Sequence, residues 1–120
     1  MEVKTIAVDF DGVLHSYITP WVAPHIIPDP PVEGAVEWWN RIAYEYDAYV
    51  LTTRAQTMGG IAAIRRWMKK YGFYVSPNLT ITATKFAASI YVDDRGYRFT
   101  GDNFPSVEYI QNASRWGSHT

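Results

Sequence analysis

The sequence predicts an α/β domain built on a parallel sheet, with helices on both faces in a three-layer α/β/α arrangement. Strand-like and helix-like runs alternate along the chain, which favours parallel strands joined by helical crossovers. In addition, four strand-like runs are each followed by a polar or charged side chain. That pattern is typical of the carboxyl edge of an open parallel sheet, where ligands bind.

Composition supports one folded domain over residues 1–120 and excludes several classes of protein. An apolar content of 48%, with 16% aromatic residues, provides a core and argues against disorder. A net charge of −1 creates no strong field towards nucleic acid or a membrane, so we expect neither as a partner. The chain has no cysteine, which excludes thiolate catalysis and is compatible with the cytoplasm, the location we expect. We also expect no signal peptide and no membrane span.

The first strand-like run lies within residues 5–14 (TIAVDFDGVL) and stops on two acids, Asp9 and Asp11, followed by Gly12. In an extended backbone, residues i and i+2 point the same way, so both carboxylates can face one small volume. Two anions at that separation repel, and a divalent cation would relieve the repulsion. The alternative is that one of the two carboxylates caps a loop or the next helix.

An irregular, proline-rich stretch follows at about residues 15–31. We expect Tyr17 and Trp21 either to pack this loop onto the sheet or to stack on the ring of a substrate. His15 and His25 are expected to form hydrogen bonds within the loop, because neither has a second histidine at a metal-ligand spacing.

Two runs have helical periodicity. Residues 34–46 are expected to form a helix that begins near Pro30-Pro31, and residues 59–71 a helix that ends at Gly72. The predicted inward side chains are Val36, Trp39, Ala43 and Tyr46 in the first helix, and Ile61, Ile64, Met68 and Tyr71 in the second. The opposite face of the second helix carries Arg65, Arg66, Lys69 and Lys70, which we interpret as a solvated face.

Three further strands are predicted, each followed by polar side chains. Residues 48–51 lead into Thr52-Thr53-Arg54, residues 79–84 lead into Lys85, and residues 88–92 lead into Asp93-Asp94-Arg95. Residues 97–100 could add a short edge strand and residues 106–113 a last helix. Together with the first acid pair, these polar groups should converge on one site.

These motifs resemble those of the haloacid-dehalogenase-like (HAD) superfamily of phosphohydrolases, whose fold is Rossmann-like. The segment DFDGVL at residues 9–14 is similar to the first motif of that family, and LTTR at residues 51–54 to the second. Lys85 can serve as the third motif and Asp93-Asp94 as the fourth. The resemblance covers roughly residues 3–100. It implies a minimally capped hydrolase, because the insert at about 15–31 is far too short for a cap domain.

The resemblance also implies a mechanism. Asp9 would be the nucleophile that forms an aspartyl-phosphate, and Asp11 the general acid and base. Mg²⁺ would be held by the side chains of Asp9 and Asp94, with Asp93 as the rival ligand, and by the carbonyl oxygen of Asp11. The remaining motif residues would act on the phosphoryl group and substrate: Thr52 as a hydrogen-bond donor, Lys85 as a counter-charge, and Thr53 and Arg54 as substrate contacts, with Arg54 and Arg95 flanking the mouth.

The expected substrate is a phosphorylated small molecule. Three alternatives remain at this point: a nucleotide or nucleic-acid-end phosphatase, a catalytically silent HAD-like binding module, and a signalling receiver. The receiver is disfavoured because its phosphoacceptor aspartate lies on a middle strand, where this chain has Thr52 and Lys85. A homo-oligomer is also open, since a neighbouring subunit could serve as the lid.

Overall fold

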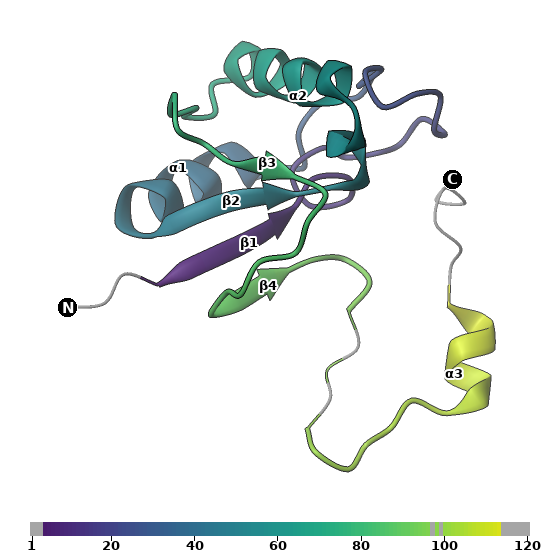
Figure 1. The fold of residues 1–120 in the computed structure, drawn as a ribbon. Coiled ribbons are helices and arrows are strands. Elements are labelled where there is room, and N and C mark those ends of the chain that lie inside the picture. The colour runs from purple at the N-terminus through teal and green to yellow at the C-terminus, as the bar shows by residue number, and fades with distance from the viewer. Residues whose placement is uncertain (1–3, 97, 99, 114–120) are drawn as a thin grey trace.

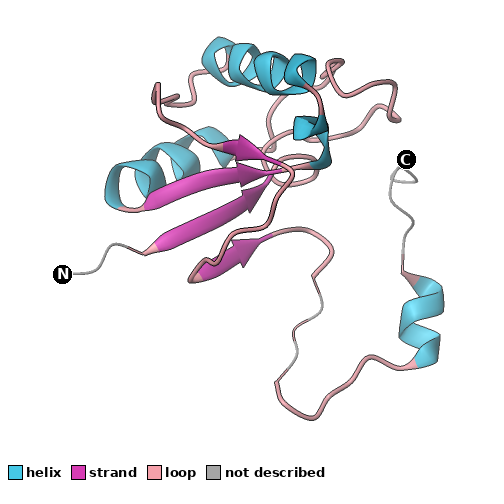
Figure 2. Cartoon of the chain, viewed as in Figure 1, coloured by secondary structure: helices cyan, strands magenta, loops and turns pink. Residues whose placement is uncertain are grey.

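The computed structural model describes residues 4–96, 98 and 100–113. Its centre is a four-stranded, all-parallel sheet in the order β3-β2-β1-β4 (Figures 1 and 2). The strands are β1 (Thr5–Asp9), β2 (Asp47–Leu51), β3 (Ile81–Thr82) and β4 (Ile90–Val92); the helices are α1 (Ala35–Glu45), α2 (Met58–Lys70) and α3 (Val107–Asn112), with a 3-10 turn, η1, at Thr53–Gln56. The predicted α/β class with a parallel sheet is confirmed.

Helix α1 matches the predicted range of residues 34–46 to within one residue at each end. Pro30-Pro31 does not start it, because this part of the chain pairs with the residues after β1: the Ser16 amide donates to the Pro30 carbonyl at 3.0 Å. The helix starts only after Gly34, whose φ of 85° is left-handed. Helix α2 matches its prediction to within one residue at each end, and Gly72, at φ 89°, terminates it as expected.

Both long helices cover the same face of the sheet, and they form the core there. The buried cluster joins alternate strand residues to α1 and α2, and includes Ile6, Val8, Val50, Trp39, Ile64, Trp67 and Met68. Trp39 is buried as predicted, whereas Tyr46 lies beyond the end of α1 and is exposed. The first two crossovers run in the same direction, from β1 to β2 to β3, and right-handed crossovers in one direction place their helices on one face.

The predicted helices on both faces are therefore not found among the described residues. The crossover from β3 to β4 reverses direction and reaches the other face, but its residues 83–89 contain no helix. Helix α3 lies apart from the sheet (Figure 1). The arrangement that the structure describes is a sheet with a helical layer on one side.

The two outer strands are shorter than predicted. Strand β3 has two residues instead of the expected 79–84, and β4 has three instead of 88–92. Each pairs with a single neighbour, so fewer backbone hydrogen bonds hold its ends extended. The predicted strand at 97–100 includes residues 97 and 99, which lie outside the described part of the chain. The last helix is found at Val107–Asn112, with the Ser106 side chain accepting from the Tyr109 amide at its start.

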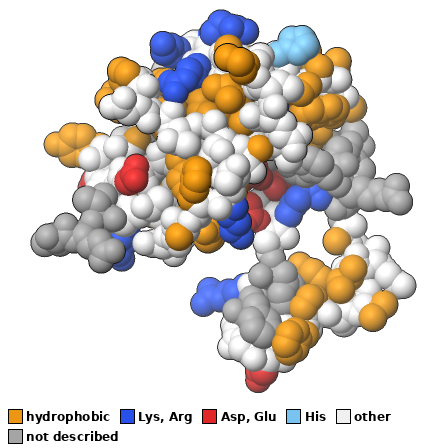
Figure 3. Space-filling view, in the orientation of Figure 1, with side chains coloured by type: hydrophobic (Ala, Val, Ile, Leu, Met, Phe, Trp, Pro, Cys, Tyr) orange, Lys and Arg blue, Asp and Glu red, His pale blue; other side chains and the backbone are white. Residues whose placement is uncertain are grey.

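The outward face of α2 carries exposed Arg66, Lys69 and Lys70, and Figure 3 shows Lys and Arg side chains gathered over this helix. Arg65 is different, because its guanidinium donates to the carbonyl oxygens of Ser76 and Leu79 and so ties the next loop to α2. No helix in the described chain is both long and apolar enough to cross a membrane.

Candidate active site

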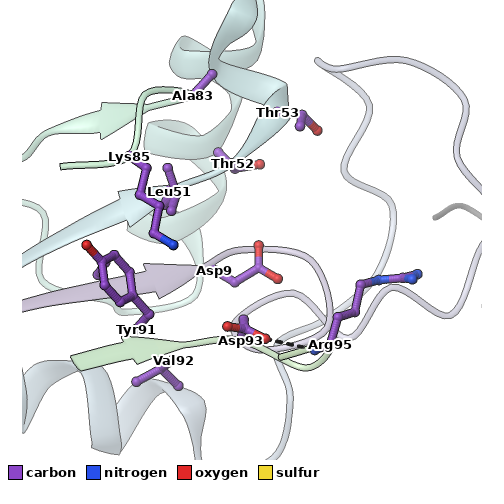
Figure 4. A pocket seen from close by; sticks show the side chains of 11 residues that line it. Asp9, Leu51, Thr52, Thr53, Ala83, Lys85, Tyr91, Val92, Asp93 and Arg95 are labelled. Carbon is purple, nitrogen blue, oxygen red and sulfur yellow. Dashed lines mark hydrogen bonds between the residues drawn. The ribbon is translucent and has the colours of Figure 1, made fainter. Parts of the chain in front are cut away.

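The polar groups that follow the strands meet at one edge of the sheet, beside a cleft of about 370 Å³ (Figure 4). Asp9 is the last residue of the central strand β1, and Thr52 follows its neighbour β2. Of the nine predicted site residues, the six that contribute to the cleft wall are Asp9, Thr52, Thr53, Lys85, Asp93 and Arg95. The other three, Asp11, Arg54 and Asp94, are not part of that wall.

Asp9 has an unusual electrostatic environment. Burial and the neighbouring carboxylates of Asp94, Asp11 and Asp93 together raise its pKa from 3.8 to about 7, with burial the largest cause and Asp94 the next. The Phe10 amide donates to Asp9 Oδ1 at 2.9 Å and opposes this rise in pKa. The surrounding negative charge therefore acts against ionisation of Asp9 unless a cation offsets it.

Thr52 and Lys85 lie on the side of the cleft formed by β2 and β3. Thr52 is buried, and its Oγ1 accepts from the Arg54 amide at 3.2 Å, which starts the turn η1 and leaves the hydroxyl proton available for donation. Lys85 follows β3 by three residues, and its Nζ lies 4.3 Å from the centre of the Tyr91 ring. This cation–π contact holds the ammonium group at the cleft wall.

The two acids after β4 have different surroundings. Asp93 Oδ1 accepts from the amides of Arg95 and Gly96, so this carboxylate shapes the turn after β4. The Asp94 carboxylate lies directly against the backbone of Gly12, where a Cβ atom would overlap it. Gly12, at φ 87°, thus allows Asp94 to approach the loop that follows β1.

These carboxylates suit a hard divalent cation. Asp94 stands close enough to Asp9 to be its strongest charged neighbour, and Mg²⁺ binds through one or two carboxylates with water completing its shell. Within the described residues, no group of three His, Cys, Asp or Glu side chains is already arranged around a single point. Asp9 and Asp94 are the side chains that would hold the ion.

Asp11 lies on the other side of the loop that follows β1, away from the cleft. It is 1% exposed, and both of its carboxylate oxygens are within hydrogen-bond distance of Arg54 Nε, at 2.9 and 3.2 Å. Its Oδ1 is also 2.8 Å from His15 Nδ1. The Asp11 carboxylate is thus part of a buried ion pair rather than of the cleft.

Arg54 was expected at the mouth of the site, and the structure places it in the interior instead, with 1% of its surface exposed. Its Nη1 donates to the carbonyl oxygens of Ala23, Pro24 and Ile26 at 2.9–3.1 Å. The Trp21 ring covers the guanidinium at 4.4 Å. Burying so large a cation is tolerable only with this many partners, so Arg54 is fully used in holding the loop.

His15 and Asp29 complete the same network, and Asp29 was not predicted from the sequence. The ring of His15 is fully buried and lies between the Asp11 carboxylate and the Asp29 amide, which donates to His15 Nε2 at 3.1 Å. Asp29 in turn accepts from the amide and hydroxyl of Thr19. His15 is therefore a hydrogen-bonding residue of the loop, as expected. The sequence signal for Asp29 was its position between Pro28 and Pro30, because the carboxylate of an acid in such a loop can accept hydrogen bonds from backbone amides.

The loop that was predicted to stand in place of a cap packs beside α2 and η1. Tyr17 is buried, and Trp21 stacks on Arg54, so the packing alternative holds for both. The Trp67 indole of α2 donates to the Asp29 carbonyl at 3.0 Å. None of the described residues 15–31 contributes to the wall of the cleft at Asp9.

No family model, no curated protein and no solved structure matches this chain.

Proposed function

We propose that the chain is a HAD-type phosphate-monoester hydrolase that uses Asp9 as its nucleophile. The observation that supports this most is the setting of Asp9, at the carboxyl end of the central strand, facing a cleft that also contains Thr52 and Lys85. Attack by an Asp9 oxygen on phosphorus would form an acyl-phosphate bond and break the bond from phosphorus to the ester oxygen, and the departing alkoxide would take a proton from water. A second water would then hydrolyse the acyl phosphate, releasing inorganic phosphate and returning the carboxylate.

The other residues have separate tasks in this proposal. The Thr52 hydroxyl would donate to a phosphoryl oxygen, and the Lys85 ammonium would offset negative charge as the transition state forms. Mg²⁺ held by Asp9 and Asp94 would neutralise charge on the substrate and lower the cost of bringing an anion to an acidic edge. A cytoplasmic location remains part of the proposal.

The position of Asp11 keeps a second function under consideration. Its carboxylate is bound by the side chains of Arg54 and His15, and Asp11 is absent from the cleft wall. A side chain in that state would have to change partners before it could pass a proton to a leaving group. The arrangement favours, as the second candidate, a phosphate-binding module without turnover.

Hydrolysis of p-nitrophenyl phosphate with Mg²⁺ tests the proposal, and the variants Asp9→Asn and Asp47→Asn provide the comparison. Asp47 is an exposed acid at the opposite end of the sheet. We expect Asp9→Asn to lower the rate at least about a thousandfold and Asp47→Asn to leave it within about twofold. Turnover by Asp9→Asn at more than a few per cent of the wild-type rate would exclude Asp9 as the nucleophile. Mg²⁺-dependent phosphate binding with no turnover would favour the binding module.

A further inference from the structure

The cleft beside Asp9 lies on the face of the sheet that the helices do not cover. In the parallel register, Ala7 pairs with Tyr49 and Tyr91, and Asp9 pairs with Leu51, so these side chains share one face. Helices α1 and α2 pack on the other face, through Ile6, Val8 and Val50 among others.

The crossover from β3 to β4 covers part of this second face. Its Phe86 packs edge-on against Tyr49 at 5.7 Å, and the Phe86 amide and carbonyl both bond to the Tyr49 hydroxyl. The crossover leaves the sheet at Ala83 and re-enters it at β4, and the cleft opens between these two points. The part of the cleft that is nearest the strand termini meets Asp9 (Figure 4).

The two ends of the cleft differ in chemistry. Asp9, Asp93 and the threonines lie towards the strand termini, whereas the more apolar part of the wall comes from Ala7, Leu51, Ala83 and the ring of Tyr91, with Lys85 Nζ over that ring. A volume of about 370 Å³ is within the range of small-molecule sites. A phosphate group at Asp9 would leave the apolar part of the wall unused, so the cleft suits a ligand with an organic group attached to its phosphate.

The Tyr91 ring is fixed at this wall. Its hydroxyl donates to the Phe86 carbonyl at 2.6 Å, and Lys85 Nζ approaches the ring at 4.3 Å. A ring with a settled orientation adds apolar surface to the wall at low entropic cost, beside the ammonium group that lies over it.

We infer that this cleft binds the organic part of a phosphate monoester whose alcohol is aromatic and carries few polar groups. The inference rests on the proposed function, because it places the phosphate at Asp9. A nucleobase is a poorer fit than a hydrocarbon ring. Its polar edges would face Ala7 and Leu51, whose side chains offer no hydrogen bond in place of the one lost with water.

Binding of non-hydrolysable phosphonates, measured by calorimetry in Mg²⁺, tests the inference without requiring turnover. We expect benzylphosphonate to bind at least about tenfold more tightly than methylphosphonate, and more tightly than adenosine 5′-monophosphate. Ala83→Trp should fill the cleft and reduce the benzyl-to-methyl ratio to below about threefold. Ala87→Trp is the matched control, since Ala87 is exposed on the same crossover and outside the cleft wall, and it should keep the ratio.

A second pair of variants guards against a misfolded Ala83→Trp protein. Tyr91→Ala should also reduce the ratio, while Ile90→Ala, one residue earlier and on the other face of β4, should not. Equal binding of the two phosphonates, tighter binding of the nucleotide, or no binding of any of them would overturn the inference. Selective benzylphosphonate binding without hydrolysis of any monoester would retain the subsite and reject the hydrolase.

Discussion

At the scale of single residues, Asp9 and Asp11 have opposite environments although only one residue separates them. Asp9 faces other carboxylates and has a raised pKa, whereas Asp11 is paired with the buried cation of Arg54. Strand periodicity would send both side chains the same way, but β1 ends at Asp9 and the chain turns at Phe10. The turn separates the two carboxylates, and their effects on stability should therefore differ in sign.

Asp9→Asn should stabilise the metal-free protein above neutral pH. The folded-state pKa of Asp9, about 7, exceeds the unfolded value of 3.8, so the folded protein binds the extra proton and loses stability as pH rises between these values. Asparagine removes that penalty, and the free energy of unfolding at pH 8 should increase by roughly 1–3 kcal/mol. The gain should vanish near pH 4. Thermal melts in EDTA measure it, with Asp47→Asn as control, and an equal gain at both pH values would contradict the stated cause.

Arg54→Met should be strongly destabilising. It leaves the Asp11 carboxylate buried without its cation and frees three loop carbonyls, and breaking such a pair costs about 3–5 kcal/mol. Urea unfolding measures the loss, against Arg66→Met on the exposed face of α2, which should stay within about 0.5 kcal/mol of wild type. Adding Asp11→Asn to Arg54→Met should cost less than the two single changes summed. A loss below about 1 kcal/mol for Arg54→Met would mean that the pair contributes little.

At the scale of elements, the proline-rich loop is a fixed part of the fold. It is anchored at one side by Arg54 and at the other by Asp29, whose carboxylate accepts from Thr19 and whose carbonyl accepts from Trp67. Burial raises the pKa of Asp29, but the hydrogen bonds that Thr19 donates to its carboxylate outweigh burial and hold that pKa below 3.8. Asp29 therefore stabilises the loop above about pH 4 and loses this effect as pH falls further.

Asp29→Asn should loosen this loop without unfolding the sheet. Hydrogen exchange at the Thr19 amide should become at least about tenfold faster, which corresponds to the loss of one charge-assisted hydrogen bond. Amides of β1 should keep their protection. Glu33→Gln, an exposed change just beyond the loop, is the control and should alter neither. Unchanged exchange at Thr19 in Asp29→Asn would show that proline stiffness alone fixes the loop.

Sequence periodicity was sufficient for the elements that carry the core. Residues such as Trp39, Ile64 and Met68 recur at helical spacing, and burial enforces that spacing locally. The ends of β1 and β2 were predictable from their apolar runs, and Asp9 and Thr52 lie at the cleft because parallel strands end at one edge of the sheet. The role of Arg54 was not predictable, because its partners at residues 23–26 are distant in sequence and are backbone carbonyls that any residue type could supply.

At the scale of the whole molecule, the direction of each crossover determines which face of the sheet it covers, and local sequence patterns do not. Alternation of strands and helices predicts a parallel sheet but does not specify on which face each helix packs. The order β3-β2-β1-β4 puts α1 and α2 together and sends residues 83–89 alone to the other side. The same order leaves Tyr91 facing the cleft, although nothing in its immediate sequence distinguishes it from a core tyrosine.

Strand order also sets when the acidic residues meet during synthesis. Strand β1 is made first, but its pairing with β4 joins Ile6 to Ile90, across most of the described chain. The ribosome therefore completes the residues of α1, β2 and α2 before it makes Asp93 and Asp94, the acids that follow β4. Of the strand pairings in the sheet, this one closes the longest loop and so has the largest entropic cost. The same pairing brings Asp93 and Asp94 towards Asp9. If the chain folds as it is made, α1 and α2 can pack on β1 and β2 before Asp93 and Asp94 add their charges beside Asp9.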